Sequence, residues 1–477
     1  MNEKVLSADI LKCLQEPARE KIDAALHAEA AASRCKIVVL DDDPTGVQTV
    51  HDVSVYTDWS VDSIEQGFAE KNRLFFVLTN SRSFTREQTT LVHREIAENV
   101  AAAAARTGQE YMIVSRGDST LRGHYPLETE LLREGWRAAS GRDMDGEILC
   151  PYFYEGGRFT LGNVHYVRSG SSLVPCGQTE FARDETFGYH ASDLPEYIEE
   201  KTGGDCPAES VICIPLERLR TADFDAVEQQ LLEAHDYARV IVNAADDADV
   251  RAFAVALYRA MRRGRRFTIR CAAALVKALG DIDSRPLLTH AELLPLRSAN
   301  GGIIVVGSHT QKTTRQLEEL KKCEGVLFYE MNSDLVLQEG ALEAETARLI
   351  SQAGKAIAAG KTVCISTRRT LLTVPNDTPE QALLRSVKIS NAVQRCVAEL
   401  PVTPAFVIAK GGITSSDVGT KALRVRRALV LGQIEPGIPV WRTGPESRFP
   451  GVPYVIFPGN VGEADTLLHA AERLIGN

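Results

Sequence analysis

Short β-branched runs alternate with helix-like segments along most of this chain, and that alternation constrains the fold more than any other feature. Between residues 36 and 245 the candidate strands are KIVVL, RLFFVLT, YMIVS, GEILC, VICIPL and ARVIVNAA. Helical patterns separate them, for example Arg86 to Ala105, where Gly108 suits a helix stop, and Leu127 to Ala139. Strands that alternate with helices are typical of parallel sheets with helices on both faces. The sequence therefore predicts an α/β fold.

A second series of the same kind follows and indicates a second domain. Its candidate strands are NGGIIVVGS, GVLFYE, KTVCIST, AFVIAKGG and YVIFPGN. A stretch rich in proline, glycine and polar residues, around 285–300, separates the two series, and 477 residues exceed what one hydrophobic core usually serves. We expect a helical N-terminal extension over 1–33 and two α/β domains with largely parallel sheets, over 34–290 and 300–477, with an active-site cleft between the domains.

The charge balance and the cysteines exclude several classes of protein. The chain has 54 Lys and Arg residues against 64 Asp and Glu, a net charge of -10, which argues against a nucleic-acid scaffold. The basic RRGRR at 262–266 is interpreted as the solvated end of a helix that begins near Val250. The cysteines form no C-x-x-C pair and no metal-ligand spacing with histidine, and we expect Cys13, Cys271 and Cys396 to be buried thiols in helices.

Targeting and membrane signals are absent from the sequence. No secretory signal opens the chain, and no apolar run reaches the length of about 18 residues that a membrane-spanning helix needs. We therefore expect a cytoplasmic protein with reduced thiols and with neither a membrane nor a nucleic-acid partner. A homodimer is the commonest arrangement of soluble oligomers and is the assembly we expect.

Charged side chains follow three successive candidate strands of the first series. KIVVL leads into DDDPTG at 41–46, where adjacent carboxylates repel one another unless a cation or polar ligand compensates. The next two strands lead into NSRS and SRGDSTLRGH, which contribute Arg82, Arg116, Asp118 and Arg122. Ligands of open α/β sheets bind beyond the carboxyl ends of the strands. Because arginine forks bind carboxylates and aspartates accept hydrogen bonds from hydroxyls, these residues indicate a site for a small polyhydroxylated acid. The alternative is an ordinary turn at DDDPTG, with salt bridges at the other loops.

The segment 151–187 differs from its surroundings. It carries five glycines and many polar residues with little periodicity. We expect a loop-rich excursion, and a long loop inside a compact domain is usually functional.

The second series has junctions between strands and helices that are rich in glycine, serine and threonine. They lie in VVGSHTQKT, AKGGITSSDVGTKAL and FPGNVGEADTLLHAAERL, and we expect Ser308, a preferred N-cap residue, to open the first helix. Helix N-termini present free N–H groups and a positive dipole end, so these junctions indicate a cradle for phosphates, the alternative being well-capped helices with tight turns. The chain contains no G-x-x-x-x-G-K-[ST] motif, no G-x-G-x-x-G after its first strand, and no H-R-D or D-F-G.

These motifs resemble those of the four-carbon acid sugar kinase family. The matching segments are DDPTG, DSTLRGH, EGGRFTLGNVHYV, FARDETFGY, GSHTQKT, GGITSSDVGTKAL and LGQIEPGIPVWR, in order over roughly residues 36 to 470. The resemblance implies an N-terminal acid-sugar domain and a C-terminal nucleotide domain. It also implies phosphorylation of threonate, erythronate or 3-oxo-tetronate by ATP.

The resemblance and the strand-end positions together give the candidate site residues. The candidate catalytic residues are Asp42, Asp43 and Asp118, and the candidate substrate-binding residues are Arg82, Arg116, Arg122 and Arg158. The candidate ATP-binding residues are Ser308, Gly411, Gly412, Ile413, Thr414 and Gly459, with Asn460 and Gly462 in the same junctions. Ile413 stands where the family often has an acidic residue, which leaves only backbone contacts to ATP there, and His124 stands where many members have Asn.

Phosphoryl transfer depends on positioning and charge neutralisation more than on covalent chemistry. We hypothesise that Arg122 or Arg82 pairs with the acid's carboxylate and that Asp42 or Asp43, with Asp118 as a further candidate, orients the attacking hydroxyl. Mg²⁺ bridges the ATP phosphates in this hypothesis, and no protein ligand for the metal is assigned. The alternatives are a non-catalytic sensor of acid sugar and nucleotide, and an NAD-linked sugar-acid dehydrogenase.

Overall fold

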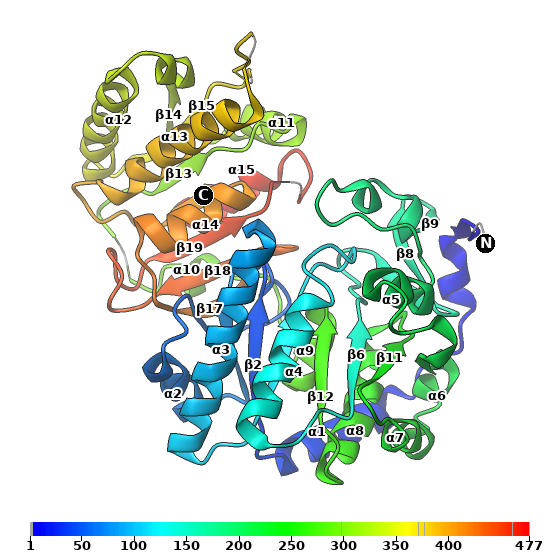
Figure 1. Ribbon diagram of the computed structural model, residues 1–477. Coiled ribbons are helices and arrows are strands. Elements are labelled where there is room, and N and C mark those ends of the chain that lie inside the picture. Colours follow the sequence, from blue (N-terminus) through cyan, green and yellow to red (C-terminus); the bar gives the residue numbers. More distant parts are fainter. Residues whose placement is uncertain (1–2, 297, 371, 376, 460, 477) are drawn as a thin grey trace. The chain divides into compact units, whose positions relative to one another are not determined.

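In the computed structural model the chain forms two compact units, and the structure describes residues 3–296, 298–370, 372–375, 377–459 and 461–476. The first unit comprises residues 1–49 and 58–283, and the second comprises 50–57 and 284–477. Figure 1 labels their helices and strands. Each unit is an α/β fold, with a parallel sheet at the centre of the first and a mixed sheet, parallel over its larger part, in the second, which confirms the predicted class.

A parallel sheet forms the centre of the first unit, with the strand order β10-β11-β6-β12-β5-β2-β4. Its strands are β2 (Lys36–Asp41), β4 (Leu74–Leu78), β5 (Tyr111–Arg116), β6 (Gly146–Cys150), β10 (Ile212–Ile214), β11 (Ala238–Val242) and β12 (Phe267–Cys271). Every residue of β2, β4, β6 and β12 is buried. Strands covered on both faces read as continuous apolar runs, which is why KIVVL and RLFFVLT stand out in the sequence.

The helices of the first unit follow the predicted alternation. They are α1 (Arg19–Ala32), α2 (Val61–Ala69), α3 (Arg86–Thr107), α4 (Leu127–Ser140), α5 (Leu194–Thr202), α6 (Leu216–Arg220), α7 (Phe224–Leu232), α8 (Asp247–Arg262) and α9 (Ala273–Leu279). Local sequence sets the ends of α3, since Thr85 and Gln88 form a reciprocal capping box and Gly108 stops the helix at φ 69°. α3 packs against α2 and α4, which lie in front of the sheet in Figure 1, whereas α1 packs against α8.

The segment predicted as a loop-rich excursion forms an antiparallel sheet instead. The strands β7 (Arg158–Leu161), β8 (Val164–Ser169) and β9 (Ser172–Pro175) pair in sequence, and β1 (Leu6–Ser7) pairs with β9. Gly162 and Gly170 adopt φ of 54° and 58° between these strands. Two of the five glycines that suggested a loop therefore form the tight turns of hairpins, where positive φ is required. The N-terminal extension is accordingly helical only in part, because β1 precedes α1.

The second unit contains a mixed sheet in the order β3-β17-β18-β19-β16-β13-β15-β14. The strands from β19 to β14 are parallel, and the strands from β3 to β19 are antiparallel. The strands are β3 (Val53–Tyr56), β13 (Ile303–Val306), β14 (Val326–Met331), β15 (Thr362–Thr367), β16 (Val407–Lys410), β17 (Arg427–Glu435), β18 (Ile438–Thr443) and β19 (Pro453–Phe457). The helices are α10 (His290–Leu293), α11 (Gln311–Leu320), α12 (Ala341–Ala358), α13 (Pro379–Ala398), α14 (Gly412–Asp417) and α15 (Thr466–Ile475).

The strand β3 lies far in sequence from the rest of its unit. The sequence-based boundaries left it within 34–290, but it pairs with β17, with Val53 opposite Val430. A partner almost four hundred residues away leaves no local signal in the sequence of either strand.

Several predictions about individual segments differ from the structure. The strand β12, with the sequence FTIRC, was not predicted, and Cys271 is therefore in a strand rather than a helix. Cys13 is exposed, whereas Cys396 is buried in α13 as expected. The prediction for RRGRR is confirmed, because α8 ends at Arg262.

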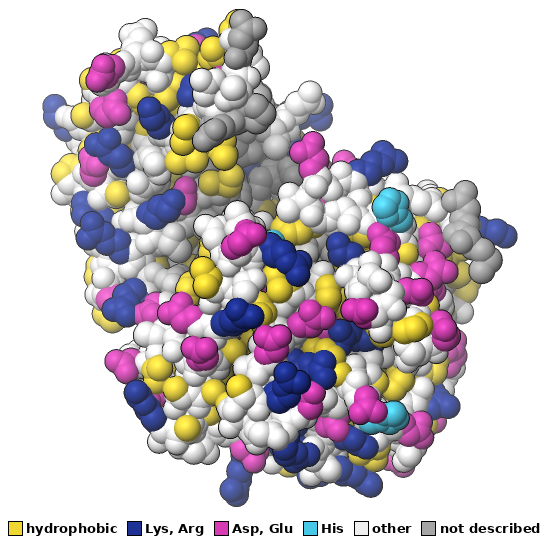
Figure 2. Space-filling view, in the orientation of Figure 1, with side chains coloured by type: hydrophobic (Ala, Val, Ile, Leu, Met, Phe, Trp, Pro, Cys, Tyr) yellow, Lys and Arg dark blue, Asp and Glu magenta, His cyan; other side chains and the backbone are white. Residues whose placement is uncertain are grey.

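The surface mixes charges of both signs. On the face shown in Figure 2, Lys and Arg side chains are interspersed with Asp and Glu. Over the described ranges, every helix is too short or too polar to span a bilayer.

Candidate functional site

The aspartate triplet lies at the carboxyl end of β2, and its three carboxylates have different partners. Asp41 is buried, and its Oδ1 lies 3.1 Å from Nη1 of Arg116 at the end of β5. Burial raises the pKa of Asp41 to about 7, against the opposing effect of Arg116. A Cβ on Gly46 would lie 2.0 Å from the Asp41 carboxylate, so a larger residue would displace it. Asp41 therefore packs into the sheet rather than facing a ligand.

Arg82 neutralises the other two members of the triplet. Its guanidinium donates to both oxygens of Asp42, at 3.2 and 2.7 Å, and its Nη1 lies 3.3 Å from Oδ2 of Asp43. Asp43 also accepts hydrogen bonds from N and Oγ1 of Thr45, at 2.8 and 2.5 Å. Burial alone would raise the pKa of Asp43, but Arg82 and Thr45 hold it below its ordinary value. The Asp43 side chain is 21% exposed against 3% for Asp42, so Asp43 is the more open to a ligand.

Asp118 follows β5 and forms a second paired group. Nε of Arg122 donates to Oδ2 of Asp118 at 2.7 Å, and Oγ1 of Thr120 donates to the same oxygen. Nη1 of Arg122 lies 3.7 Å from Asp184. Burial opposes ionisation, yet Arg82 and Arg122 hold the pKa of Asp118 well below its usual range. Asp118 is therefore an ionised hydrogen-bond acceptor at neutral pH.

A buried ion pair beneath this rim was missed by the sequence analysis. Arg270 of β12 pairs with Glu128 of α4 and donates to the Arg122 carbonyl at 3.3 Å. Its guanidinium fills the space beside Gly117 and Gly123, where a Cβ would approach it to 2.2 and 2.5 Å. Arg270 thus supports the loop that carries Asp118, and a prediction of β12 from FTIRC was needed to find it.

The antiparallel sheet and the segment that follows it fix the same loop from another side. The carbonyls of residues 119, 120 and 121 contact Nε2 of His165 at 2.8 Å, the hydroxyl of Tyr189 at 2.6 Å and that of Tyr197 at 2.9 Å. Leu121 has φ 68°, a conformation that residues other than glycine rarely adopt without support. His165 of the antiparallel sheet, together with Tyr189 and Tyr197 after it, therefore holds the DSTLRGH loop in place.

Arg158 of β7 is the arginine of this group whose charge is not matched. No carboxylate of the described residues lies within ion-pair distance of its guanidinium. Its Nη1 donates to the Gly156 carbonyl, and its buried Nε has no hydrogen-bond partner among the described residues. Its guanidinium lies 5.5 Å from the ring centre of Phe181, and that of Arg122 lies 5.1 Å from the same ring. Burial, and to a lesser extent the charge of Arg122, lowers the pKa of Arg158. An anion bound beside Arg158 would pair with the buried guanidinium charge and offset the lowering of its pKa.

In the second unit, loops after β13, β16 and β19 meet. A Cβ on Gly411 would lie 3.2 Å from Cβ of Ser308 and from Oγ1 of Thr414, and one on Gly459 would lie 3.6 Å from Oγ of Ser308. Gly411 has φ 123°, which other residues rarely adopt. Four of the six predicted nucleotide-binding residues are thus brought together.

The other two predicted residues lie beside this group. Gly412 begins α14, and no atom of the described chain lies within 4 Å of the position that its Cβ would take. The Ile413 side chain is 72% exposed. Gly462 has φ 84°, and Asn460 lies outside the described residues.

The N-cap predicted at Ser308 is wrong by two residues. α11 begins at Gln311, and the N-cap is Thr310, whose Oγ1 accepts the Thr313 N–H at 3.2 Å. The chain leaves β13 at Val306, and Ser308 lies in the connecting turn. There its Oγ contacts Oγ1 of Thr313 at 3.0 Å.

Two cations at this end of the second sheet were missed as candidates. Lys410, the last residue of β16, is buried and donates to the carbonyls of Pro458 and Gly459 at 2.6 and 3.2 Å, and burial lowers its pKa to about 7. Arg369, after β15, donates to the Ser308 carbonyl at 2.5 Å, and its buried Nη1 has no partner in the described part of the chain. Their signal in the sequence was position alone, since Lys410 ends one strand of the nucleotide series and Arg369 follows another.

No cluster of three or more His, Cys, Asp and Glu side chains suited to a metal ion occurs in the described ranges. The candidate aspartates Asp42, Asp43 and Asp118 are instead paired with arginines. The metal assignment in the sequence analysis was left open, and these residues provide no enclosed metal site.

Both halves of the chain match models of known protein domains. Residues 37–279 match the model of a sugar-binding N-terminal domain, and residues 303–467 match that of a nucleotide-binding C-terminal domain. No curated protein sequence matches the chain.

Solved structures share the fold at low sequence identity. A Salmonella typhimurium LT2 protein provisionally named a tRNA synthase has a TM-score of 0.66 at 16% identity, over 91% of this chain and 98% of that one. A Haemophilus influenzae protein of the DUF1537 family has a TM-score of 0.63 at 14% identity, over 92% of this chain and 100% of that one. These likenesses describe the fold alone.

The two family models occur in the order that the sequence motifs imply and together span most of the chain. A sugar-binding domain followed by a nucleotide-binding domain is the architecture of one family, and this chain belongs to it: the four-carbon acid sugar kinase family.

Proposed function

We propose that the protein transfers the γ-phosphoryl group of ATP to a hydroxyl of a four-carbon sugar acid of the threonate, erythronate or 3-oxo-tetronate class. The family's sugar-binding and nucleotide-binding domains support a reaction between two such ligands. The observation that carries the proposal is Arg158, an arginine without a carboxylate partner in the described residues, which lies over the same Phe181 ring as Arg122, whose charge Asp118 already pairs.

The carboxylate of the acid binds at Arg158 in this proposal. Arg82, Arg116 and Arg122 already contact aspartates, so a ligand that displaced these aspartates would leave buried charges unpaired. Arg158 has guanidinium N–H groups without hydrogen-bond acceptors in the described residues. Its guanidinium and that of Arg122 lie over the same ring, that of Phe181. A guanidinium binds a carboxylate through two parallel hydrogen bonds, which would select an acid over a neutral sugar.

Asp43 is the proposed acceptor of the hydroxyl proton. The sugar oxygen attacks the γ-phosphorus, the bond to the β–γ bridging oxygen breaks, ADP leaves, and the proton passes to the Asp43 carboxylate late in the reaction. Arg82 and Thr45 keep Asp43 ionised, and it is the most exposed of the three candidate aspartates. Asp42 and Asp118 are more deeply paired and act by holding the arginines.

ATP binds in this proposal at the loops that carry Ser308, Gly411, Thr414 and Gly459. Gly411 allows its backbone to pass close to Ser308, and the unpartnered Nη1 of Arg369 supplies a donor for a phosphate oxygen. Mg²⁺ bound together with ATP would supply charge neutralisation at the phosphates, and no described side chain is assigned to hold it. Transfer then requires that the bound hydroxyl and the γ-phosphate meet during turnover.

Release of ADP, measured with a panel of tetronic acids, tests the proposal. Activity that requires both ATP and one of these acids is expected. Binding of the acids without ADP release would favour a sensor, and a change in nicotinamide absorbance would favour a dehydrogenase.

Variants then test the roles of the residues. Arg158→Gln should raise the KM for the acid by about 10- to 100-fold, the loss of a charge-assisted hydrogen bond. Asp43→Asn should lower kcat by about 10²- to 10⁴-fold with little change in the KM for ATP. Arg168→Gln, which removes an exposed arginine of β8, is the matched control and should alter neither constant. Equal losses in Arg158→Gln and Arg168→Gln would contradict the assignment of the acid's carboxylate.

A further inference from the structure

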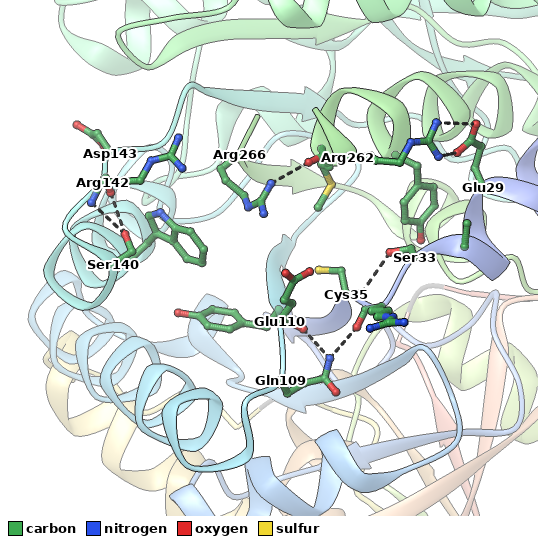
Figure 3. Close-up of a pocket in the computed structure, with 16 residues that line it drawn as sticks. Glu29, Ser33, Cys35, Gln109, Glu110, Ser140, Arg142, Asp143, Arg262 and Arg266 are labelled. Atoms are coloured by element: carbon green, nitrogen blue, oxygen red, sulfur yellow. Dashed lines mark hydrogen bonds and ion pairs between the residues drawn. The ribbon is translucent and has the colours of Figure 1, made fainter. Parts of the chain in front are cut away.

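A cavity of about 600 Å³ opens at the amino-terminal ends of β2, β5 and β12 (Figure 3). It lies at the end of the first unit's sheet opposite to the one where Asp41 and Arg116 end their strands. Six residues of β2 separate it from that rim, a distance of about 20 Å at the usual rise of a strand. The cavity is therefore separate from the site of the proposed reaction.

The N-terminal extension contributes one wall of this cavity. Glu29 of α1 pairs with Arg259 and Arg262 of α8, at 2.9 and 2.5 Å, and these pairs fix the end of α1 against α8. The match to the sugar-binding domain begins only at residue 37. The wall formed by residues 29–35 is thus an addition to the matched domain, and it converts an open sheet end into a pocket.

The charges lining the cavity are unbalanced in favour of cations. Arg262 is turned toward Glu29, and Asp143 pairs with Arg133 at 2.6 Å, so these groups are neutralised (Figure 3). Three further lining arginines, Arg34, Arg142 and Arg266, have no carboxylate within ion-pair distance in the described part of the chain. Apart from the paired Glu29 and Asp143, the carboxylate that lines the cavity is that of Glu110, which is exposed. In Figure 3 the Arg266 guanidinium points toward the open middle of the cavity.

The cavity also has an aromatic and apolar side. Trp136 and Tyr111 meet edge to face with ring centres 5.4 Å apart, and both line the cavity. A narrow apolar slot continues from it beneath Trp136 and Met261, toward Leu132 and Met144. The buried Nε1 of Trp136 has no hydrogen-bond partner in the described residues. Such a wall accepts a flat ring, and the spare indole N–H offers a donor.

We propose that this cavity binds a small anion of the phosphate class joined to an aromatic ring. Guanidinium groups bind phosphate through paired hydrogen bonds, and the volume lies within the range of ordinary ligand pockets. The ring would lie against Trp136 and Tyr111, with the phosphate toward Arg142, Arg34 and Arg266. This inference does not rest on the proposed phosphoryl transfer, and it adds a second ligand site to the first unit.

Phenyl phosphate is the probe, used with the full chain carrying 5-fluorotryptophan and followed by ¹⁹F NMR. The chain has three tryptophans, so the Trp136 resonance can be assigned by its loss in Trp136→Phe. Saturable shifts of this resonance are expected, while those of Trp59 and Trp441 stay in place. Absence of a shift in all three tryptophan resonances at millimolar phenyl phosphate would overturn the proposal, and that outcome can be read from the wild-type chain without the variant.

Calorimetry with two double variants tests the role of the arginines. Arg34→Gln/Arg142→Gln removes two exposed side chains and should weaken phenyl phosphate binding by at least about tenfold. Arg86→Gln/Arg168→Gln removes the same charge from other exposed positions of the first unit and should leave the affinity within about twofold. Equal affinities of the two double variants would overturn the proposal. Inorganic phosphate alone should bind more weakly than phenyl phosphate, and equal binding of the two would remove the aromatic ring from the proposed ligand class.

Discussion

Protonation of His165 should destabilise the first unit as the pH falls from neutral to about 4.5. His165 is fully buried in β8, with Nε2 at 2.8 Å from the carbonyl of Ser119 and Nδ1 at 2.9 Å from Oγ1 of Thr160. Burial lowers the pKa of His165 to about 4 from an ordinary value of 6.5. The neutral ring donates from Nε2 to the carbonyl, accepts from Thr160, and so holds the loop that carries Asp118.

The sign and the size of the effect follow from this shift. Because the pKa of His165 is lower in the folded state, the unfolded chain takes up the proton first, and stability that is complete above pH 6.5 is lost on descent toward pH 4. The full difference is about 3 kcal/mol, at roughly 1.4 kcal/mol per pKa unit. At pH 4.5 about 2.5 kcal/mol of it is lost.

Other groups titrate over the same range, so the measurement must be a difference between two proteins. Burial raises the pKa of Asp41 to about 7, and protonation of this carboxyl stabilises the fold as the pH falls, with the opposite sign. We therefore compare the wild type with His165→Gln, whose amide can still donate to the Ser119 carbonyl but does not titrate.

Urea unfolding of the two proteins, measured between about pH 7.5 and pH 4.5, is the assay, with the transition of the first unit fitted separately. The wild type should exceed His165→Gln in unfolding free energy at pH 7.5, and this gap should shrink by about 2.5 kcal/mol at pH 4.5. His235→Gln, which removes an exposed histidine far from this loop in the sequence, is the control for the loss of a histidine side chain. A gap for His165→Gln that stays constant would refute the buried neutral imidazole and its role beneath the loop.

Three further predictions concern other parts of the two sites. Gly46→Ala should lower the unfolding free energy by about 2 kcal/mol or more and reduce turnover, because the new Cβ would displace the Asp41 carboxylate. Denaturant unfolding measures the first effect and steady-state kinetics the second. An unchanged denaturation midpoint would contradict the close approach of Gly46 to Asp41. Arg369→Gln should raise the KM for ATP by about tenfold and leave the KM for the sugar acid unchanged, and an effect on the acid alone would remove Arg369 from the nucleotide site. The pKa of Lys410 is lowered to about 7, so the unfolded state binds its proton first and stability should rise with pH above 7. Relative to Lys410→Met, the wild type should gain about 2 kcal/mol between pH 7 and pH 9, and parallel curves would contradict the buried amine.

The sequence predicted best those features that depend on neighbours along the chain. Continuous apolar runs identified β2, β4 and β5, and the rule that ligands gather at the carboxyl ends of strands then directed attention to Arg82, Arg116 and Asp118. The structure brings these side chains to one rim. The same rule directed attention to the three loops that meet around Ser308 and Gly411.

Features that depend on distant partners could not be read from the sequence. The sequence indicated that a cation or a polar ligand must offset the repulsion within the aspartate triplet, but it did not identify the partners, which are Arg116 from β5 for Asp41 and Arg82 from the loop after β4 for Asp42. Arg270 and Glu128 are 142 residues apart and meet only because β12 lies next to β5. The hairpins β7 to β9 did leave a local signal, in Gly162 and Gly170 at their turns, but glycine-rich polar sequence predicts a loop equally well.

The buried arginine–carboxylate pairs of the first unit are better explained by the fixed positions that they give to the site's charged groups than by a gain in stability. A buried ion pair gains little net stability, because the loss of hydration offsets most of the attraction, so Arg116 with Asp41 and Arg270 with Glu128 are poor explanations of the fold's stability. They do place the guanidinium groups and carboxylates at fixed positions before any ligand arrives. A ligand carboxylate that binds Arg158 then forms a new ion pair without breaking an existing one. Binding also costs less conformational entropy, because the other charged side chains of the site are already held in place. Arg158→Lys should accordingly bind the acid much more weakly than the wild type does, and only a little better than Arg158→Gln. A lysine retains the positive charge but loses the planar fork that binds a carboxylate through two hydrogen bonds.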